Sequence, residues 1–339
     1  MIDGKLAICV IGAGRAGMIH ARNYAKNVPG AMIAAVSDPV EETARAGAEE
    51  LGCKYYLSED QALENDKIDA YVVVSPTKFH VDIVKKLAAA KKHIFCEKPM
   101  AMTVDECDEM IKACQGNKVK LQIGFMRRFD EGFCQAKQII EAGEIGDVVM
   151  VHSNTRGPSV PRPWMYDIHK SNGPLAEVNS HDIDTMRWFT GSEFKSVYAI
   201  GGNYRCSEAK EEWPDFYDNV VMSAEFENGM QGMLDGAQGV GYGYDAKVEI
   251  LGTKGIIQLG GMQGQRLVTM KASNNSGIYP LVNSWRDLFK DAYLNEDVSF
   301  ADAVLNDKPV KVTGHDGKMA VQVVNAGNIS IVEKRIVRL

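Results

Sequence analysis

The sequence lacks several features that would place it in a special class of protein. No uninterrupted apolar stretch in its 339 residues approaches the roughly 20 residues that a membrane-spanning helix needs. Positive charge is not in excess either, because 38 Lys and Arg stand against 45 Asp and Glu, a formal net charge of -7. Such a charge repels nucleic acid and anionic membrane surfaces. We therefore expect neither a membrane nor a nucleic acid as a partner.

Cysteine pairs and an export signal are missing as well. The seven cysteines are scattered, and none forms the C-x-x-C pair that zinc and redox sites use, so we expect free thiols and no bound metal. The first residues, Met1–Ala7, lack the basic region, the long apolar region and the cleavage site of a signal peptide. These features favour a protein of the reducing cytoplasm.

The first third of the chain has the pattern of a parallel sheet. Apolar runs rich in β-branched residues alternate with segments of helical period, which is typical of βαβ units. The expected strands are 6–11, 32–37, 70–74, 93–96 and 120–123, and the expected helices are 16–26, 40–51, 80–90 and 104–113. We predict an α/β fold that begins with a doubly wound, NAD-binding Rossmann domain over residues 1–124.

Beyond about residue 146 the pattern changes to strands separated by turns that contain Gly and Asn. The expected strands are 148–153, 196–201, 219–225, 229–236, 247–251 and 256–259, followed by helical stretches near 284–305 and 317–331. We predict a second, α+β domain over residues 125–339, with a large, predominantly antiparallel open sheet for substrate binding and oligomerisation. Its last helices are expected to pack back toward the first domain. A sheet with one uncovered face usually finds a partner, so we expect a homodimer or homotetramer.

A glycine-rich loop lies between the first predicted strand and the first predicted helix, which is the context that makes G-x-G-x-x-G informative. The loop consists of Gly12, Ala13, Gly14, Arg15, Ala16 and Gly17. Gly12 permits a tight turn, Gly14 lets backbone approach a pyrophosphate, and Gly17 lets the helix pack closely.

Asp38 ends the second predicted strand, where a carboxylate accepts hydrogen bonds from ribose hydroxyls and repels a 2′-phosphate. Loop and acid together predict NAD rather than NADP as the cofactor. A glycine turn without a ligand and an Asp-Pro turn are the alternatives.

Glu97, Lys98 and Pro99 follow the fifth predicted strand, at the edge where sheets of this kind bind ligands. Here the sequence resembles the glucose-fructose oxidoreductase / inositol dehydrogenase (Gfo/Idh/MocA) family, whose E-K-P motif carries the active-site lysine. The resemblance covers nearly the whole chain, and it is nearest to inositol 2-dehydrogenases in the segments 124–130, 243–245, 285–287 and 292–293. It implies a sharp turn with a cis Lys98–Pro99 bond. It also implies that the cofactor contacts Ser75, Pro76, Thr77, His80, Glu97, Lys98 and Arg127, in addition to the glycine loop and Asp38.

The same resemblance points to an acid-base pair in the second domain. Family members usually carry D-x-x-x-H at the start of a helix, and this chain has Glu177 and His181 at that spacing, which puts both on one helix face. The resemblance implies that His181 accepts the hydroxyl proton, a task that suits an unperturbed pKa of about 6.5. Glu177 would bind a neighbouring hydroxyl or orient the imidazole, and Lys98 would hydrogen-bond the substrate oxygen. The alternatives are a solvated lysine, a helix-capping histidine and an ion-paired glutamate.

Two departures from the family bear on the substrate. Glu177 replaces the usual Asp, and the His-Arg-Asn-Pro that inositol dehydrogenases often show reads Thr155-Arg156-Gly157-Pro158. Trp164 lies in a segment that is longer than in those enzymes, so a glycoside or a sugar acid is a candidate beside an inositol. Trp164 and Tyr244 could equally be packing residues. The predicted substrate contacts are Lys98, Arg127, Thr155, Arg156, Trp164, Glu177, His181 and Tyr244.

Together these features predict an NAD-dependent dehydrogenase that oxidises a secondary hydroxyl of a cyclic polyol or sugar. Two alternatives stay open: an enzyme of the same fold that retains NAD and cleaves a glycosidic bond, and a non-catalytic NAD-binding regulator. The presence of both Lys98 and His181 argues against the regulator, because a pure binding protein needs neither.

Overall fold

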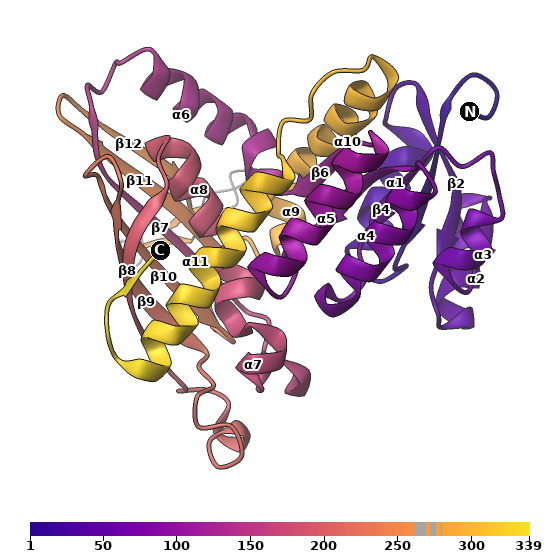
Figure 1. The fold of residues 1–339 in the computed structure, drawn as a ribbon. Coiled ribbons are helices and arrows are strands. Elements are labelled where there is room, and N and C mark those ends of the chain that lie inside the picture. The colour runs from indigo at the N-terminus through magenta and orange to yellow at the C-terminus, as the bar shows by residue number, and fades with distance from the viewer. Residues whose placement is uncertain (262–268, 272–275, 279) are drawn as a thin grey trace. The chain divides into compact units, whose positions relative to one another are not determined.

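Two sheets of different character divide the chain (Figure 1). The computed structural model describes residues 1–261, 269–271, 276–278 and 280–339. Met1–Phe129 and Asp291–Val321 form a first compact unit, and Asp130–Lys290 and Gln322–Leu339 form a second unit. The division after Phe129 lies near the boundary expected at residue 124, and the chain returns to the first unit for residues 291–321.

The first unit is built on a six-stranded parallel sheet in the order β3-β2-β1-β4-β5-β6. The strands are β1 (Leu6–Ile11), β2 (Ala31–Ser37), β3 (Lys54–Tyr56), β4 (Ala70–Val73), β5 (His93–Glu97) and β6 (Leu121–Gly124). β1 is buried along its whole length, as a central strand covered on both faces should be. The sheet confirms the predicted Rossmann fold. Sequence analysis missed β3, because this short strand lies at the sheet edge and begins with two exposed residues.

The first unit contains the four helices that the sequence predicts and a short one, α3, that it does not. They are α1 (Gly17–Lys26), α2 (Glu41–Leu51), α3 (Glu59–Leu63), α4 (His80–Ala89) and α5 (Val104–Asn117), with short 3₁₀ turns at Thr77–Phe79 and Met126–Phe129. α5 starts at a capping box in which Thr103 and Glu106 each bond the other's backbone N–H. α10 (Lys290–Leu305) completes this unit's core, where its Phe300 packs with Phe95 of β5. Among the helices that the structure describes, none is long and apolar enough to cross a membrane.

The second unit contains a seven-stranded sheet in the order β12-β11-β7-β10-β9-β8-β15. The strands are β7 (Val148–Gly157), β8 (Phe194–Gly202), β9 (Asn219–Phe226), β10 (Gln231–Gln238), β11 (Asp245–Gly252), β12 (Ile256–Gly260) and β15 (Val337–Arg338). β7 and β10 are parallel and every other neighbouring pair is antiparallel, which confirms the predicted sheet type. A separate hairpin pairs β13 (Thr269–Lys271) with β14 (Ser276–Ile278).

The helices of the second unit are α6 (Glu131–Glu141), α7 (Ile168–Ser171), α8 (Ser180–Thr190), α9 (Trp285–Leu288) and the end of α11 (Gly314–Glu333). 3₁₀ turns lie at Pro163–Met165 and Ser207–Ala209, and a π-helical turn at Leu175–Asn179 precedes α8. The single helical stretch expected near 284–305 was wrong in one respect, since α9 ends before Phe289. Phe289 is buried against Phe133 and leaves helical geometry before α10 begins.

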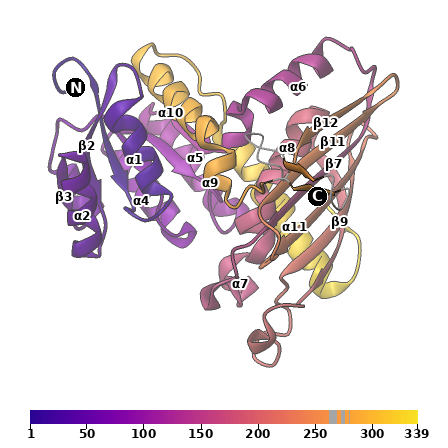
Figure 2. The same cartoon turned by 180° about the vertical axis from the view of Figure 1, so that it is seen from behind.

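The two faces of the larger sheet differ in what covers them (Figure 2). α8 packs against β7 and β10, and near the end of α11 the Ser330 hydroxyl accepts the Ala199 N–H at 2.9 Å. The opposite face exposes a set of apolar side chains: Tyr198, Ile200, Val221, Met233 and Leu251. α8 therefore lies on the inner face, and the apolar set defines the outer face.

Candidate active site

The glycine loop has the geometry that the sequence predicts for a dinucleotide site. Gly12 has a φ of +95°, and a Cβ there would lie 2.6 Å from the Val74 carbonyl oxygen. A Cβ on Gly17 would lie 1.7 Å from the Gly12 oxygen, so the helix approaches the turn too closely for any side chain. A Cβ on Gly14 would meet nothing within 4 Å. Two glycines therefore shape the loop, and Gly14 leaves its backbone open to a ligand.

The N-terminus of α1 is arranged to hold an anion. Ala16 at the N-cap provides no side-chain hydrogen bond, and the first turn contains no acidic residue. Unpaired N–H groups and the helix dipole together favour a negatively charged group at such an end. The start of α1 therefore has the features that suit a bound anion.

Asp38 follows β2 and ties that strand to the glycine loop. One of its carboxylate oxygens accepts the Ala13 N–H at 2.9 Å, and the other accepts the Val40 N–H at 2.9 Å. The bond to Ala13 fixes the carboxylate beside the loop. A carboxylate has about four lone-pair sites, so Asp38 can accept further bonds from ribose hydroxyls.

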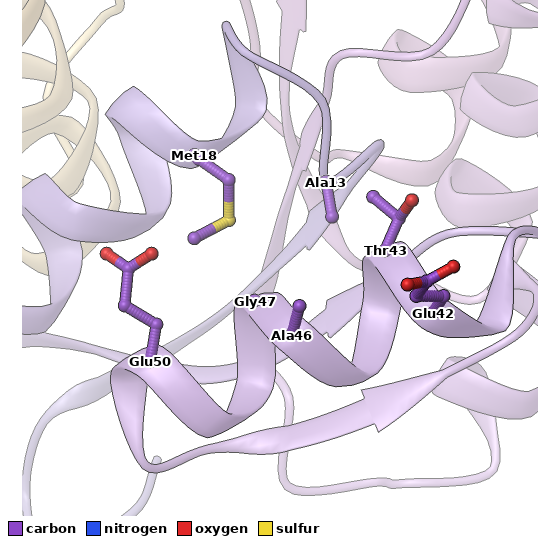
Figure 3. Close-up of a pocket in the computed structure, with 7 residues that line it drawn as sticks. All are labelled: Ala13, Met18, Glu42, Thr43, Ala46, Gly47 and Glu50. Carbon is purple, nitrogen blue, oxygen red and sulfur yellow. The ribbon is translucent and has the colours of Figure 1, made fainter.

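A cavity of about 400 Å³ lies between α1 and α2, beside the glycine loop (Figure 3). The Met18 side chain points toward Gly47, where a Cβ would lie 3.1 Å from the Met18 sulfur. Two of the residues that line the cavity, Glu42 and Glu50, carry carboxylates that repel phosphate. Their charge disfavours this cavity as the place for a pyrophosphate.

The loops after β1, β4, β5 and β6 lie at one edge of the first sheet, because all its strands are parallel. This edge brings together the predicted cofactor residues of these loops: the glycine loop, Ser75, Pro76, Thr77, Lys98 and Arg127. The Lys98–Pro99 bond is cis, as predicted. Lys98 is partly exposed and Arg127 is buried.

His80 connects two of these loops. It is buried, with Nε2 2.7 Å from the Ser75 carbonyl oxygen and Nδ1 3.0 Å from that of Pro99. Burial lowers the pKa of His80, whereas the carbonyl oxygens that face its two ring nitrogens act against that shift. The ring therefore positions the segments that carry Ser75 and Lys98, a contribution that the sequence alone did not reveal.

Glu97, another predicted cofactor residue, lies in a buried cluster of the first unit. One of its carboxylate oxygens accepts the Lys98 N–H at 2.9 Å, and the other lies 3.1 Å from His20 Nε2. His20 Nδ1 lies 2.8 Å from an oxygen of Asp297. Sequence analysis missed His20, Glu296 and Asp297, although the resemblance had placed Glu97 at the site.

Glu177 and His181 lie in consecutive helical turns of the second unit. Glu177 belongs to the π-helical turn Leu175–Asn179, and His181 is the second residue of α8. The motif therefore opens a helix, as predicted, with a wider first turn than an α-helix has. π-helical turns are frequent at functional sites. His181 is 6% exposed and Glu177 is half-buried.

Asp182 fixes the start of α8 to the sheet. Its Oδ1 accepts the hydroxyls of Ser153 at 2.6 Å and Thr155 at 3.0 Å, and its Oδ2 accepts the Asn179 amide at 2.8 Å. Asp182 is fully buried, so these bonds form away from water and hold the helix that carries His181. Thr155, a predicted substrate contact, bonds Asp182 with its hydroxyl.

Arg156 points to the other face of β7. Its Nε donates to Asp235 Oδ1 at 2.6 Å, and the second oxygen of Asp235 lies 3.1 Å from His152 Nε2. Neighbouring residues of a strand point to opposite faces, so the structure does not bring Arg156 and Thr155 together.

The two aromatic candidates differ in exposure. Trp164 lies in the 3₁₀ turn Pro163–Met165 and is 55% exposed, so the alternative that it is packed beneath a loop was wrong. Tyr244 is 7% exposed, and its ring lies 3.4 Å from the position that a Cβ on Gly157 would take. Trp164 is free to stack on a ring, whereas Tyr244 packs on β7.

Two family models match the chain. One, described as an oxidoreductase family with an NAD-binding Rossmann fold (GFO_IDH_MocA), matches residues 6–125. The other, described as the GFO/IDH/MocA C-terminal domain, matches residues 133–258.

The chain is also similar to individual proteins over almost its full length. Myo-inositol 2-dehydrogenase of Thermotoga maritima is 35% identical over 335 residues, which cover 98% of each chain. Scyllo-inositol 2-dehydrogenase (NAD(+)) of Bacillus subtilis is 33% identical, over 95% of this chain and 93% of that protein. The solved structure of scyllo-inositol dehydrogenase from Lactobacillus casei, with bound NAD(H) and scyllo-inositol, has a TM-score of 0.89 and is 27% identical, over 98% of this chain and 99% of the other.

Proposed function

Because the chain belongs to the Gfo/Idh/MocA oxidoreductase family, we propose that it is an NAD-dependent dehydrogenase that oxidises a secondary hydroxyl of a cyclic polyol or sugar. The observation that carries this proposal is the edge of the first sheet, where the open glycine loop and Lys98 lie in loops of one parallel sheet. Relatives that match nearly the full length of the chain are named as inositol 2-dehydrogenases, and inositol is a cyclic polyol.

In this proposal the first unit binds NAD and the second unit binds the substrate. The loop Gly12–Gly17 and the end of α1 hold the pyrophosphate, and Asp38 accepts the ribose hydroxyls. The remaining cofactor contacts in this proposal come from the loops after β4, β5 and β6. They are Ser75, Pro76, Thr77, His80, Glu97 and Arg127. A 2′-phosphate beside Asp38 would meet a like charge, so NAD is preferred over NADP.

NAD supplies the hydride acceptor. His181 accepts the hydroxyl proton as the carbon loses hydride, and the alcohol becomes a ketone. The Lys98 ammonium donates a hydrogen bond to the same oxygen and stabilises its negative charge as the proton leaves. Glu177 binds a neighbouring hydroxyl or orients the imidazole. Asp182 keeps the helix of His181 in place by its bonds to Ser153 and Thr155 on the inner face and to Asn179 of the preceding turn.

The substrate class rests on the second unit. Inositol-like rings are supported by the relatives, and an exposed Trp164 adds a surface on which a ring of a glycoside or sugar acid can stack. Glu177 reaches one methylene further than the usual Asp, which suits a hydroxyl placed differently on the ring. We propose Arg127, Thr155 and Tyr244 as further substrate contacts. Arg156, also predicted as one, is left out of this proposal because its Nε donates to Asp235 on the outer face of the sheet.

A substrate panel tests the function. Purified protein is incubated with NAD and each of a set of inositols, aldoses, uronates and glycosides, and NADH formation is followed by absorbance. We expect NADH with at least one polyol or sugar, and less of it with NADP. Glycoside cleavage without net NADH would instead identify an enzyme that retains its cofactor, and NAD binding without any turnover would identify a regulator.

We also propose a homo-oligomer of the cytoplasm. The outer face exposes Tyr198, Ile200, Val221, Met233 and Leu251, and an apolar sheet face of this kind favours burial against a second copy. The seven cysteines are all free thiols in the structure, which suits a reducing compartment. Sedimentation velocity of the wild type should show a dimer or tetramer, and a monomer would contradict this part of the proposal.

A further inference from the structure

A buried cluster of ionisable side chains lies next to Lys98 in the first unit. It joins three elements: His20 on α1, Glu97 at the end of β5, and Glu296 with Asp297 on α10. The exposed fractions of these four residues are 0%, 6%, 0% and 0%. Charged groups this far from water cost stability unless they are paired. The cluster is therefore stable only if its charges are paired within it.

His20 bridges two of the carboxyl groups. Its Nδ1 lies 2.8 Å from Asp297 Oδ1 and its Nε2 lies 3.1 Å from Glu97 Oε1. A neutral imidazole has one N–H, so only the imidazolium donates to both carboxylates. Burial opposes this charge, but Asp297 and Glu97 outweigh it and raise the pKa of His20 well above its ordinary value. The ring is held between Phe95 and Tyr293, whose centroids lie 5.1 and 5.6 Å from its own.

Two polar contacts and the close approach of Gly124 hold the Glu97 carboxylate in place. His20 holds one oxygen, and the Lys98 N–H donates to the other at 2.9 Å. Across from it lies Gly124 of β6, where a Cβ would come within 2.9 Å of the carboxyl carbon. The position of Glu97 therefore sets the position of the peptide group that begins Lys98.

Glu296 differs from its neighbours, because neither of its carboxyl oxygens has a hydrogen-bond partner among the described residues. One of its carboxyl oxygens lies within 4.8 Å of a ring nitrogen of His20 and of a carboxylate oxygen of Glu97. Burial and the negative charge of Glu97 raise the pKa of Glu296 well above its ordinary value. If Glu296 is a neutral acid, the positive charge of the His20 ring is balanced by the carboxylates of Glu97 and Asp297 alone.

We propose that His20 and Asp297 are positioning residues, which hold the Glu97 carboxylate and, through it, the backbone of Lys98 in the geometry that hydride transfer needs. The inference rests on the proposed role of Lys98. His20 lies on α1, the helix whose N-terminus is the pyrophosphate site, so one helix sets the positions of both the cofactor and the lysine. Asp297 holds His20 from α10, and Asn23 of α1 donates to its second oxygen at 2.8 Å. Glu296 remains a neutral acid beside them.

Two variants test the positioning without removing Lys98. Gly124→Ala pushes the Glu97 carboxylate aside and changes no charge, and Asp297→Asn removes one of the two carboxylates that hold His20. Each should lower kcat roughly 10- to 100-fold, because a displacement of about 1 Å at a reacting group has such an effect. The dissociation constant for NAD, measured by fluorescence titration, should change little. The matched control is Asp302→Asn, which removes a surface carboxylate from the same helix and should keep the wild-type kcat.

The pH dependence separates positioning from a general loss of stability. The ionisable groups near His20 are Glu97 from β5, Tyr293, Glu296 and Asp297 from α10, and Tyr24 on its own helix. In Asp297→Asn the imidazolium loses a carboxylate, so the pKa of His20 falls and its charge is lost at lower pH. The ratio of variant to wild-type kcat should therefore decrease as pH rises. Stability also depends on the charge of His20, so the folded fraction of each protein is measured by circular dichroism at every pH and the ratio is corrected for it.

Lys98→Ala distinguishes failure of this inference from failure of the proposed function. If no polyol or sugar gives NADH with the wild type, or if Lys98→Ala is fully active, the proposed role of Lys98 fails and this inference with it. If the wild type is active and Lys98→Ala is not, a folded Gly124→Ala with wild-type kcat overturns the positioning on its own, even where Asp297→Asn does not fold. A stoichiometric divalent cation in the purified protein would overturn the neutral acid at Glu296.

Discussion

Gly14→Ala should separate cofactor binding from folding. A Cβ at this position would meet nothing within 4 Å, and Gly14 does not adopt a positive φ. An alanine is therefore accommodated without strain, and the smaller entropy of the unfolded chain should stabilise the protein by about 0.4–1 kcal/mol. The same methyl group would occupy the space through which we expect the pyrophosphate to approach.

The magnitude of the binding loss follows from the bonds that the methyl group blocks. A hydrogen bond from a backbone N–H to a charged oxygen contributes about 1.5–3 kcal/mol, so losing one should raise the NAD dissociation constant roughly 10- to 150-fold. Gly17→Ala is the informative contrast. Its Cβ would lie 1.7 Å from the Gly12 oxygen, so helix and turn must move apart, with a cost of about 1–3 kcal/mol or more in folding stability.

Two measurements check this pair of variants: urea unfolding for stability and fluorescence titration for NAD. Gly14→Ala should unfold at the same or higher urea concentration than the wild type and bind NAD weakly, whereas Gly17→Ala should unfold at lower concentration. If Gly14→Ala binds NAD as tightly as the wild type, the pyrophosphate does not cross Gly14 and its proposed place at this loop is wrong.

Three further predictions concern single carboxylates and the proposed base. Asp38→Ala should lower the ratio of kcat/KM with NAD to that with NADP, because the repulsion of a 2′-phosphate is removed; a wild type that already prefers NADP would contradict the role of this residue. His181→Ala should lose roughly 10²–10⁴-fold in kcat with little change in NAD affinity, and the rise of kcat/KM with pH in the wild type should be absent from it. Near-wild-type turnover would show that another group removes the proton. Asp182→Asn keeps the side-chain volume but loses the charge that three donors share, so it should lower both thermal stability and kcat. An unchanged melting temperature and kcat would show that the three hydrogen bonds of Asp182 do not position α8.

Sequence patterns predicted what local chemistry determines. The continuous apolar run of β1, the glycines of the following loop and Asp38 after β2 all occur within a short segment, and each has a local physical reason. The position of Lys98 was equally accessible, since it follows a strand of a parallel sheet. Turns that contain Gly and Asn between short strands also indicated the larger sheet of the second unit, because such turns are local signals.

Contacts between distant segments were beyond the reach of those patterns. His20 and Asp297 are 277 positions apart, and a histidine on a helix gives no local sign that a carboxylate will meet it. Asp182 follows the predicted base His181 in the sequence, but its bonds to Ser153 and Thr155 depend on how α8 lies on β7. Side-chain direction along a strand was accessible in principle, because its period of two already separates Thr155 from Arg156. The prediction that both contact substrate did not use that rule.

The side chains of β7 alternate between the two faces of the sheet, which separates Arg156 from Thr155. α8, which carries His181, packs on the face of β7 that bears Thr155, whereas Arg156 pairs with Asp235 on the outer face. A substrate that reaches His181 is therefore on the side away from Arg156, and the outer face is the one that we propose to meet a second copy. Arg156→Met should leave KM for the best substrate unchanged and weaken subunit association in sedimentation velocity. Folding stability should fall, because Arg156 pairs with Asp235, 18% exposed, and its Nη1 also lies 3.6 Å from Oδ2 of the buried Asp245, so both measurements are made at a temperature at which the variant is fully folded. A rise of KM by roughly tenfold, which corresponds to about 1.4 kcal/mol, with an unchanged oligomer would return Arg156 to the substrate site and refute the separation of faces.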